Sequence, residues 1–409
     1  MNNIFEGFLS TSEMLEAFSE RNCLAAMLRF EASLARAQAS VGLIPEAAAQ
    51  SIIGSCKVEL FDVARIVRDS GLAGSIAIPL VKSLRETVGL LNQQAAGFVH
   101  FGATSQDVID SALALVTCDA LRLIEADVNK AVAALLALAQ RHAADPMLAR
   151  TLMQPASVTS FGLKCAGWAA PLLRSLQRLQ VSSANALSLQ LGGAVGTLAQ
   201  MKGRGPQVLA LMAADLKLRA PLFSWHTQRD EWVALGCELG LLVGSLGKIA
   251  KDISLMGQFE VGEVAEPTAP GRGGSTAMPH KRNPVACMVA LAAAQRTPQR
   301  IAALLAAMPQ EHERALGNWQ AELAEWPGLL MSVHGSARAM ALALAGLQVD
   351  APRMGANLDA LRAVLPLDAA QEWFSPALAE QAADQTRAQV KVLAALAKQL
   401  ETNTTETTP

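Results

Sequence analysis

Residues 271–284 read Gly-Arg-Gly-Gly-Ser-Thr-Ala-Met-Pro-His-Lys-Arg-Asn-Pro. The glycines and prolines exclude a helix here, whereas the chain on both sides shows helical patterns for tens of residues. Asn283 stands at a predicted N-cap and Pro284 at the first helical position of the next helix. Three consecutive bases, at 280–282, lie between two hydroxyl residues and that helix N-terminus. The stretch is therefore predicted to bind an anion, the alternative being a surface loop that only joins two helices.

Long helical patterns flank this loop. We expect long helices over five segments, the second kinked at Pro171: residues 110–145, 160–191, 232–256, 284–308 and 318–346. The third carries an apolar seam at heptad-like spacing: Trp232, Leu235, Leu239, Leu242, Leu246, Ile249, Ile253 and Met256. Because its other faces are also apolar, this helix is predicted at the centre of a bundle shared between subunits.

The two ends of the chain show shorter helical patterns. We expect three parts: an N-terminal helical domain (1–110), a central long-helix bundle (111–349) and a small C-terminal helical region (350–409). The last nine residues, 401–409, are polar and rich in threonine, so a disordered tail is expected. Residues 71–79 are predicted to form a loop, since two glycines and a proline punctuate them. No segment shows strand alternation, and the fold class is all-α.

Composition excludes several functions. The formal net charge of −2 over 409 residues argues against nucleic-acid and acidic-membrane partners. Six cysteines lie far apart without metal-ligand spacing, which indicates reduced thiols in a cytoplasmic protein without a metal site. The first residues lack the basic segment of a signal peptide. Apolar runs such as 235–246 are shorter than a membrane span.

The glycine-rich loop resembles the signature of the fumarase/aspartase superfamily, Gly-Ser-Ser-x-Met-Pro-x-Lys-x-Asn-Pro, with Thr276 in place of the second serine. The resemblance implies a homotetramer whose long helices join into one bundle, with active sites assembled from three stretches of different subunits. It implies Ser275 as the catalytic base and Lys281 as the cation opposite an enolate-like intermediate. The loop residues expected to contact the substrate are Thr276, Met278, Arg282 and Asn283.

Residues 99–107, Val-His-Phe-Gly-Ala-Thr-Ser-Gln-Asp, resemble the first shared region of that superfamily. The resemblance implies that His100 is catalytic and that Thr104, Ser105 and Gln106 bind substrate carboxylates. Capping of the following helix explains Thr104 and its neighbours equally well.

Residues 150–162, Arg-Thr-Leu-Met-Gln-Pro-Ala-Ser-Val-Thr-Ser-Phe-Gly, resemble the second shared region. The resemblance places Thr151, Gln154 and Thr159, with Ser160, as hydrogen-bonding groups around the substrate. The alternative is a capped helix start at Thr159 or Ser160.

Three further segments, 77–82, 225–230 and 308–314, are similar to the bacterial 3-carboxy-cis,cis-muconate cycloisomerases. That family implies interconversion of a 3-substituted muconate and its lactone, in aromatic catabolism of the protocatechuate type, without metal or cofactor. The substrate is then a small di- or tricarboxylate anion. For Glu311, Glu313 and Arg314, an ion-pair network at a helix end is an equal alternative.

One departure bears on the substrate. The cycloisomerases carry a histidine where Pro155 stands, and adenylosuccinate lyases carry one where Leu152 stands. Either another residue donates a proton or the substrate differs, for example by a 3-sulfo group in place of the 3-carboxyl group. A lyase of the adenylosuccinate type that releases fumarate is the alternative activity, and a catalytically inactive structural relative is the third.

Overall fold

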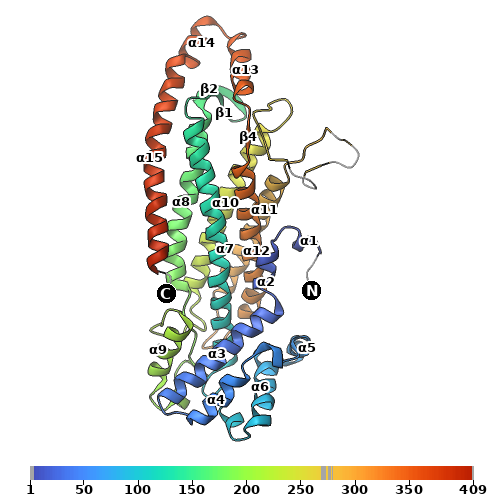
Figure 1. Cartoon of the computed structure of the whole chain (residues 1–409), viewed down its shortest axis with the longest axis vertical. Coiled ribbons are helices and arrows are strands. Elements are labelled where there is room, and N and C mark those ends of the chain that lie inside the picture. The colour runs from blue at the N-terminus through green and yellow to red at the C-terminus, as the bar shows by residue number, and fades with distance from the viewer. Residues whose placement is uncertain (1–3, 269–272, 275–277, 279, 408–409) are drawn as a thin grey trace.

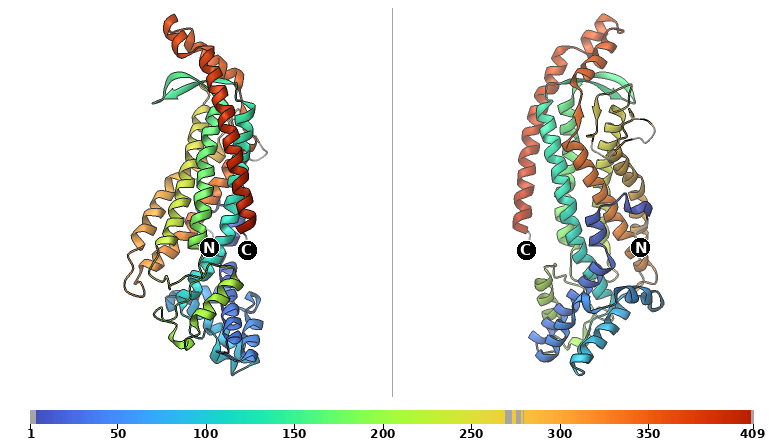
Figure 2. Two further views of the ribbon diagram at one scale, coloured as in Figure 1. Left: turned by 90° about the vertical axis from the view of Figure 1, so that its left-hand side faces the viewer. Right: turned by 45° about the vertical axis from the view of Figure 1, so that its right-hand side comes forward.

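The computed structural model describes residues 4–268, 273, 274, 278 and 280–407. Five long helices lie side by side in an elongated molecule (Figures 1 and 2). Each packs on the next, and the last returns to the first: α7 (Ser105–Arg141), α8 (Phe161–Ala186), α10 (Asp230–Met256), α11 (Val285–Ala307) and α12 (Asn318–Ala345). The predicted all-α class and central bundle are confirmed.

Helix α10 lies inside this bundle. All eight residues of its predicted seam are at most 4% exposed, because α8, α11 and α12 pack around them. The single chain therefore already buries the apolar seam, so the seam does not by itself indicate a partner subunit, and a bundle shared between subunits stays a prediction. By length and composition α10 and α12 could each cross a membrane, contrary to expectation, but more than half of the most apolar window in each is buried within the bundle. Core helices of a soluble protein pass the same test.

Shorter helices gather at one end of the bundle, around the start of α7 (Figure 1). They are α3 (Glu20–Ser40), α4 (Glu46–Ser55), η1 (Val58–Leu60), α5 (Val63–Ala73), α6 (Ala77–Leu91), η2 (Ala95–Phe98), η3 (Ala199–Met201) and α9 (Gly205–Leu216). The first two helices, α1 (Ile4–Gly7) and α2 (Ser12–Ala17), lie part-way along the bundle beside α12. The loop predicted over 71–79 is wrong, since only 74–76 separate α5 from α6. Gly74 makes the turn in the left-handed region (φ 72°), and Pro79 falls in the first helical turn, where its missing N–H is tolerated.

The opposite end carries two small antiparallel sheets, so the expectation of no strands is wrong. Strands β1 (Pro146–Thr151) and β2 (Gln154–Ser160) form a hairpin, and β3 (Val264–Ala265) pairs with β4 (Gln348–Val349). The hairpin turn consists of Leu152 and Met153 at φ 52° and 65°. Such turns favour Asn-Gly, so the sequence carries no hairpin signal here.

The C-terminal region consists of three helices. It contains α13 (Ala351–Arg362), α14 (Leu367–Trp373) and α15 (Pro376–Thr407), and α15 packs along α8 and α7. The tail predicted to be disordered is helical to Thr407, because extending a formed helix costs far less than starting one. The boundary expected between residues 110 and 111 lies inside α7.

Candidate functional site

The described part of the glycine-rich loop lines a cavity. Ser275 and Thr276 lie outside the described residues. Gly273 adopts φ 73°, which favours glycine, and its carbonyl accepts the N–H of Asn283 at 2.9 Å. The Lys281 N–H donates to the carbonyl of Met278 at 3.0 Å. The predicted site residues Lys281, Arg282 and Asn283 line a cavity of about 790 Å³ together with Gly273, Gly274 and His280.

The predicted start of helix α11 needs correction. The helix begins at Val285, with Pro284 rather than Asn283 at the N-cap. The carboxylate of Glu266 accepts the N–H groups of Ala286 and Cys287 at 3.0 and 2.8 Å. A side chain of the protein thus already compensates the helix dipole expected to hold the ligand. In this conformation, the positive charge offered to a ligand comes from the exposed side chains at 280–282.

The β1–β2 hairpin presents the second region. Thr151 and Gln154 pair beside the turn and are exposed, whereas Thr159 is half-buried at the base. The turn itself projects apolar side chains, since Leu152 is 97% and Met153 69% exposed.

An ion pair whose carboxylate is buried holds this hairpin near its turn. The guanidinium of Arg150 donates to both carboxylate oxygens of buried Glu263, at 2.7 and 3.0 Å. Asn357 of α13 donates to the same carboxylate at 2.9 Å. Because Glu263 precedes β3, the hairpin and the approach to the glycine-rich loop are held at the same end of the bundle.

The first region lies at the other end. It precedes α7, and the hairpin follows α7, whose 37 residues span about 55 Å at 1.5 Å per residue. Figure 1 shows the start of α7 and the hairpin at opposite ends of the molecule. One chain therefore does not bring the first predicted region to the other two.

His100 sits beside a buried acid. Its Nδ1 lies 2.6 Å from Oε1 of Glu31, and its backbone adopts φ 61°, which is unusual for a non-glycine residue. Burial alone would lower the pKa of His100, but the Glu31 carboxylate outweighs it and raises that pKa. A protonated imidazole is favoured here, as a proton donor or an anion contact requires.

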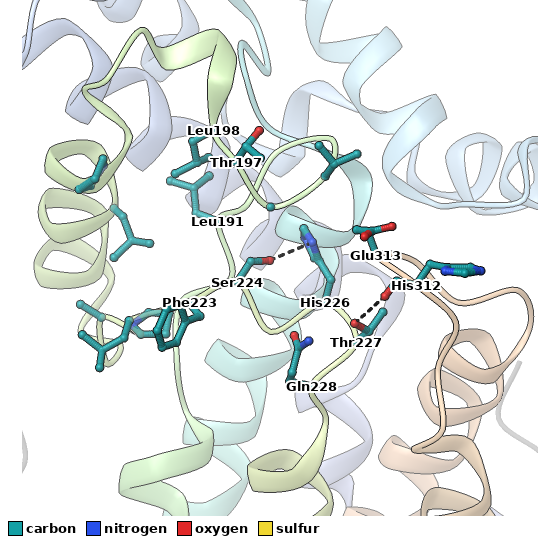
Figure 3. A pocket seen from close by; sticks show the side chains of 17 residues that line it. Leu191, Thr197, Leu198, Phe223, Ser224, His226, Thr227, Gln228, His312 and Glu313 are labelled. Atoms are coloured by element: carbon teal, nitrogen blue, oxygen red, sulfur yellow. Dashed lines mark hydrogen bonds between the residues drawn. The ribbon is translucent and has the colours of Figure 1, made fainter.

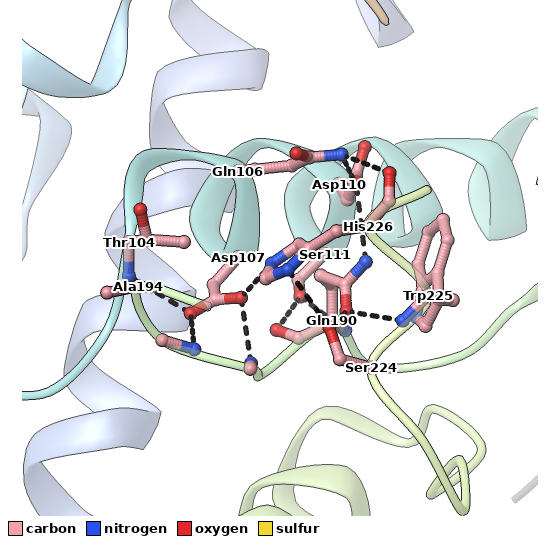
Figure 4. Close-up of polar contacts among 12 residues, drawn as sticks. Thr104, Gln106, Asp107, Asp110, Ser111, Gln190, Ala194, Ser224, Trp225 and His226 are labelled. Carbon is pink, nitrogen blue, oxygen red and sulfur yellow. Dashed lines mark hydrogen bonds and ion pairs between the residues drawn. The ribbon is translucent and has the colours of Figure 1, made fainter. Parts of the chain in front are cut away.

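Asp107 organises the start of α7. It is buried, and it accepts the backbone N–H groups of Thr104, Gly192 and Gly193 at 2.9–3.0 Å (Figure 4). The capping alternative is thus confirmed for Thr104 and Asp107. Thr104 and Ser105 are half-buried, so both residues remain accessible to a ligand.

Gln106 has a different environment. It is 1% exposed, and its amide nitrogen donates to the His226 carbonyl at 2.8 Å and to Asp110 at 3.1 Å. Its amide oxygen accepts from Arg314 at 3.3 Å. The structure places Gln106 as a brace inside the protein, which contradicts the expectation of a substrate contact.

Sequence reasoning missed the partner of Asp107. His226 Nε2 lies 2.7 Å from Asp107 Oδ1, and His226 Nδ1 lies 3.0 Å from Ser224 Oγ. Ser224 and His226 line a cavity of about 700 Å³ (Figure 3). The segment 225–230 was notable only for its family resemblance, and a contact across more than a hundred residues leaves no local signal.

Arg229 lies at the centre of a buried ion cluster under this cavity wall. Its guanidinium donates to Asp110 at 2.9 and 3.2 Å and to Glu322, and all three side chains are fully buried. Burial alone would lower the pKa of Arg229, but the two carboxylates raise it. The ring of Trp225 stacks 4.5 Å from the same guanidinium.

The 308–317 loop closes the same region. Arg314 donates to the carbonyls of Ala194 and Gly193 at 2.8 and 3.4 Å, and Glu311 accepts the N–H of Leu316 at 3.0 Å. The Arg314 contacts hold the loop to the 190–194 segment, whereas the Glu311 contact lies within the loop. The ion-pair alternative thus explains neither of these two side chains.

No group of three or more His, Cys, Asp or Glu side chains among the described residues is arranged to hold a metal ion. The six cysteines are free thiols. Burial raises the pKa of the Cys23 and Cys118 thiols to about 11, so neither is an activated nucleophile.

A protein-family model described as Lyase matches residues 8–298. A 3-carboxy-cis,cis-muconate cycloisomerase of Pseudomonas putida is 45% identical over 358 residues, which cover 88% of this chain and 85% of that protein. A nitrosuccinate lyase of Streptomyces davaonensis is 40% identical over 351 residues, 84% of this chain and 74% of that one. The crystal structure of 3-carboxy-cis,cis-muconate lactonizing enzyme from Pseudomonas putida superimposes with a TM-score of 0.87 at 37% identity, over 98% of this chain and 100% of that chain.

Proposed function

Since the chain belongs to the lyase family, in the 3-carboxy-cis,cis-muconate cycloisomerase branch of the fumarase/aspartase superfamily, we propose that it interconverts a 3-substituted cis,cis-muconate and its muconolactone. The observation that carries this proposal is the similarity to cycloisomerases along nearly the whole chain. The substrates of this family are small carboxylates. We place the enzyme in the cytoplasm, as its composition suggests.

The chemistry fits the residues of the hairpin. Lactonisation forms a bond between a carboxylate oxygen and the beta carbon, while a proton joins the alpha carbon. In the reverse direction the leaving group is a carboxylate, whose pKa near 4 lets it depart without a proton. A C–N lyase must instead protonate a departing amine. Leu152, which stands where adenylosuccinate lyases carry a histidine, therefore counts against an adenylosuccinate-type lyase.

We assign one proton transfer to Ser275, which moves the proton of the alpha carbon. Its hydroxyl needs cationic surroundings to act as a base, and the neighbouring Lys281 supplies them while it stabilises the enolate-like charge. His100 is the third catalytic residue, and the neighbouring Glu31 favours its positively charged form. The substrate is bound by Thr104, Ser105, Thr151, Gln154, Thr159, Thr276, Met278, Arg282 and Asn283.

We further propose a homotetramer with shared active sites. Region one and region two are about 55 Å apart within a chain, so a site that uses both needs different copies. The hairpin turn supports this assembly, because the apolar side chains of Leu152 and Met153 are 97% and 69% exposed in the single chain. A partner would gain roughly 1.5–3 kcal/mol from burying each.

Leu152→Asp is expected to weaken assembly, because it would bury a charge where an apolar contact is proposed. Sedimentation velocity at micromolar concentration should show a tetramer for the native protein and smaller species for the variant, with activity lost in parallel.

Leu72→Asp is the matched control. Leu72 is also 97% exposed, on helix α5, far from the hairpin, and this variant should remain tetrameric. An active native monomer, or equal effects of the two variants, would contradict the shared site.

Pro155 bears on the acidic group that the substrate carries on carbon 3. Pro155 is exposed beside the turn, in register with Arg150, and offers neither a proton nor an N–H. We propose that this position tolerates a 3-sulfo substrate, since a sulfonate stays ionised and needs space more than one proton-bearing partner.

The test compares kcat/KM for 3-carboxy- and 3-sulfo-cis,cis-muconate in the native enzyme and in Pro155→His. The native enzyme should accept the sulfo substrate at least as well as the carboxy one. The variant should shift the ratio about tenfold toward carboxylate, the size of one charged hydrogen bond. A strong native preference for the carboxy substrate that the variant leaves unchanged would exclude the role of Pro155.

A further inference from the structure

Two side chains of the N-terminal helices hold the backbone on either side of His100. Arg85 of α6 donates to the carbonyl of Val99 at 3.3 Å, and Gln38 of α3 donates to the carbonyl of Phe101 at 2.6 Å. The residue between these two anchors adopts φ 61°, a left-handed conformation that few residue types favour. The backbone from which the imidazole projects is therefore fixed from two helices.

Glu31 fixes the imidazole itself. It lies about two helical turns before Gln38 on the same face of α3, and its Oε1 is 2.6 Å from Nδ1 of His100. The Glu31 side chain is 1% exposed. Among the described residues its buried Oε2 has no hydrogen-bond partner, so the imidazole is the group that this carboxylate binds. A carboxylate that only braced the fold would use both oxygens, because buried polar atoms are normally paired.

The pairing with Glu31 decides which nitrogen of His100 is available to a ligand. A carboxylate oxygen accepts, so Nδ1 carries the hydrogen in this contact. Nε2, on the other side of the ring, makes no hydrogen bond to any residue that the structure describes. In the charged imidazole both nitrogens donate, so Nε2 offers a hydrogen together with a positive charge. Thr104, to which a substrate carboxylate is proposed to bind, follows in the same segment.

The charged groups around His100 come from three helices. Burial lowers the pKa of His100, and so does Arg85 on α6, but Glu31 on α3 and Asp107 on α7 outweigh them and raise that pKa. Cys56, which interacts with Glu31 from the end of α4, adds no charge, because burial raises the pKa of its thiol. Glu31 is thus the carboxylate in direct contact with the ring, and the imidazole is held in its charged form.

We propose that Glu31 is a positioning residue of the active site, which orients the His100 imidazole and keeps it charged so that Nε2–H donates to a carboxylate of the muconate. The inference rests on the proposed cycloisomerase function. Glu31 does not touch the substrate and acts through His100, and no proton is transferred in this contact. The N-terminal helices therefore contribute to the reaction by holding one side chain of the first region.

Glu31→Gln removes the charge and keeps an oxygen that accepts from Nδ1–H. Activity that needs the charged imidazole falls as the pH rises through the pKa of His100, and the variant lowers that pKa. In a profile of kcat/KM for the preferred muconate against pH, the alkaline limb should therefore move down by about one pH unit. Above both limbs the loss should approach about tenfold. An unmoved limb would overturn the proposal.

Gln38→Ala is the matched control, because Gln38 supports the same segment through a hydrogen bond that carries no charge. This variant is expected to lower kcat/KM alike at every pH and to leave the alkaline limb in place. A shift as large as that of Glu31→Gln would show that loosening of the segment moves the limb, and the role assigned to the Glu31 charge would be wrong.

A double-mutant cycle shows whether Glu31 acts through His100. His100→Asn removes the imidazole and keeps a residue type that tolerates the left-handed backbone. In this background, Glu31→Gln should cause no further loss of kcat/KM, because the group that it positions is gone. A further loss as large as in the native background would overturn the inference.

Proton–carbon NMR of the histidine Cε1–H groups measures the same titration without substrate. The His100 resonance is assigned by its loss in His100→Asn, and Glu31→Gln should lower its pH of half-titration by about one unit. A shift in this titration with an unmoved kinetic limb, in an active enzyme, overturns the inference. If the native enzyme turns over no muconate, the proposed function fails, and the titration alone decides: an equal pH of half-titration in both proteins overturns the role of Glu31.

Discussion

Ser275→Ala is expected to lower kcat by about a thousandfold, the usual contribution of a positioned proton-transfer group. The hydroxyl belongs to a loop that holds no part of the described core, so helix content and assembly should stay native. KM should change little, because the hydroxyl acts on the proton of the alpha carbon rather than on a carboxylate. Steady-state kinetics on the preferred muconate, together with circular dichroism, measures both effects.

Ser245→Ala is the control for this variant. Ser245 lies on α10, and its hydroxyl donates to the Leu241 carbonyl within the same helix. This substitution should leave kcat unchanged. A Ser275→Ala enzyme that keeps most of its turnover would remove Ser275 from the mechanism.

Arg229→Met is expected to cause the largest loss of stability. It would leave Asp110 and Glu322 buried without their cation, which typically costs about 3–5 kcal/mol. Burial already raises the pKa of Glu322, so removing Arg229 would raise it further. Chemical unfolding at fixed protein concentration should show a lower midpoint.

The matched control is Arg21→Met. Arg21 pairs with Glu59 on the surface, where both side chains are more than half exposed, and such pairs contribute at most about 1 kcal/mol. Equal losses of stability in the two variants would show that the effect of removing Arg229 does not come from the burial of its ion cluster.

The bundle was predictable because its helices are long and strongly patterned. Helix α10 begins and ends within two residues of its expected limits, and every residue of its seam is buried. What the periodicity could not reveal was the identity of the neighbours. An apolar helix surrounded by helices of its own chain shows the same pattern of apolar residues as a helix that packs against another subunit.

The errors arose where distant residues decide local structure. Glu266 caps α11 from twenty residues upstream. Its carboxylate therefore occupies the helix N-terminus at which a bound anion was predicted. Leu152 and Met153 form a turn that their residue types do not favour, so the hairpin carried no signal.

The pairing of Asp107 with His226 joins residues 119 apart, and only the fold brings them together. The motif match found Thr104 and Ser105, but it gave no reason to look at His226. The candidate site was thus predictable where a motif is contiguous and not where packing assembles it.

The most direct test incubates the native protein with 3-carboxy-cis,cis-muconate and follows the product by ultraviolet absorbance and proton NMR. The conjugated diene absorbance should fall, and one lactone should appear without release of fumarate or ammonia. In deuterated water, one deuterium should be incorporated at the carbon alpha to a carboxylate. The account would be contradicted if the diene absorbance of this substrate and of its 3-sulfo analogue stayed unchanged. If the protein also released fumarate from adenylosuccinate, the lyase activity would be established instead.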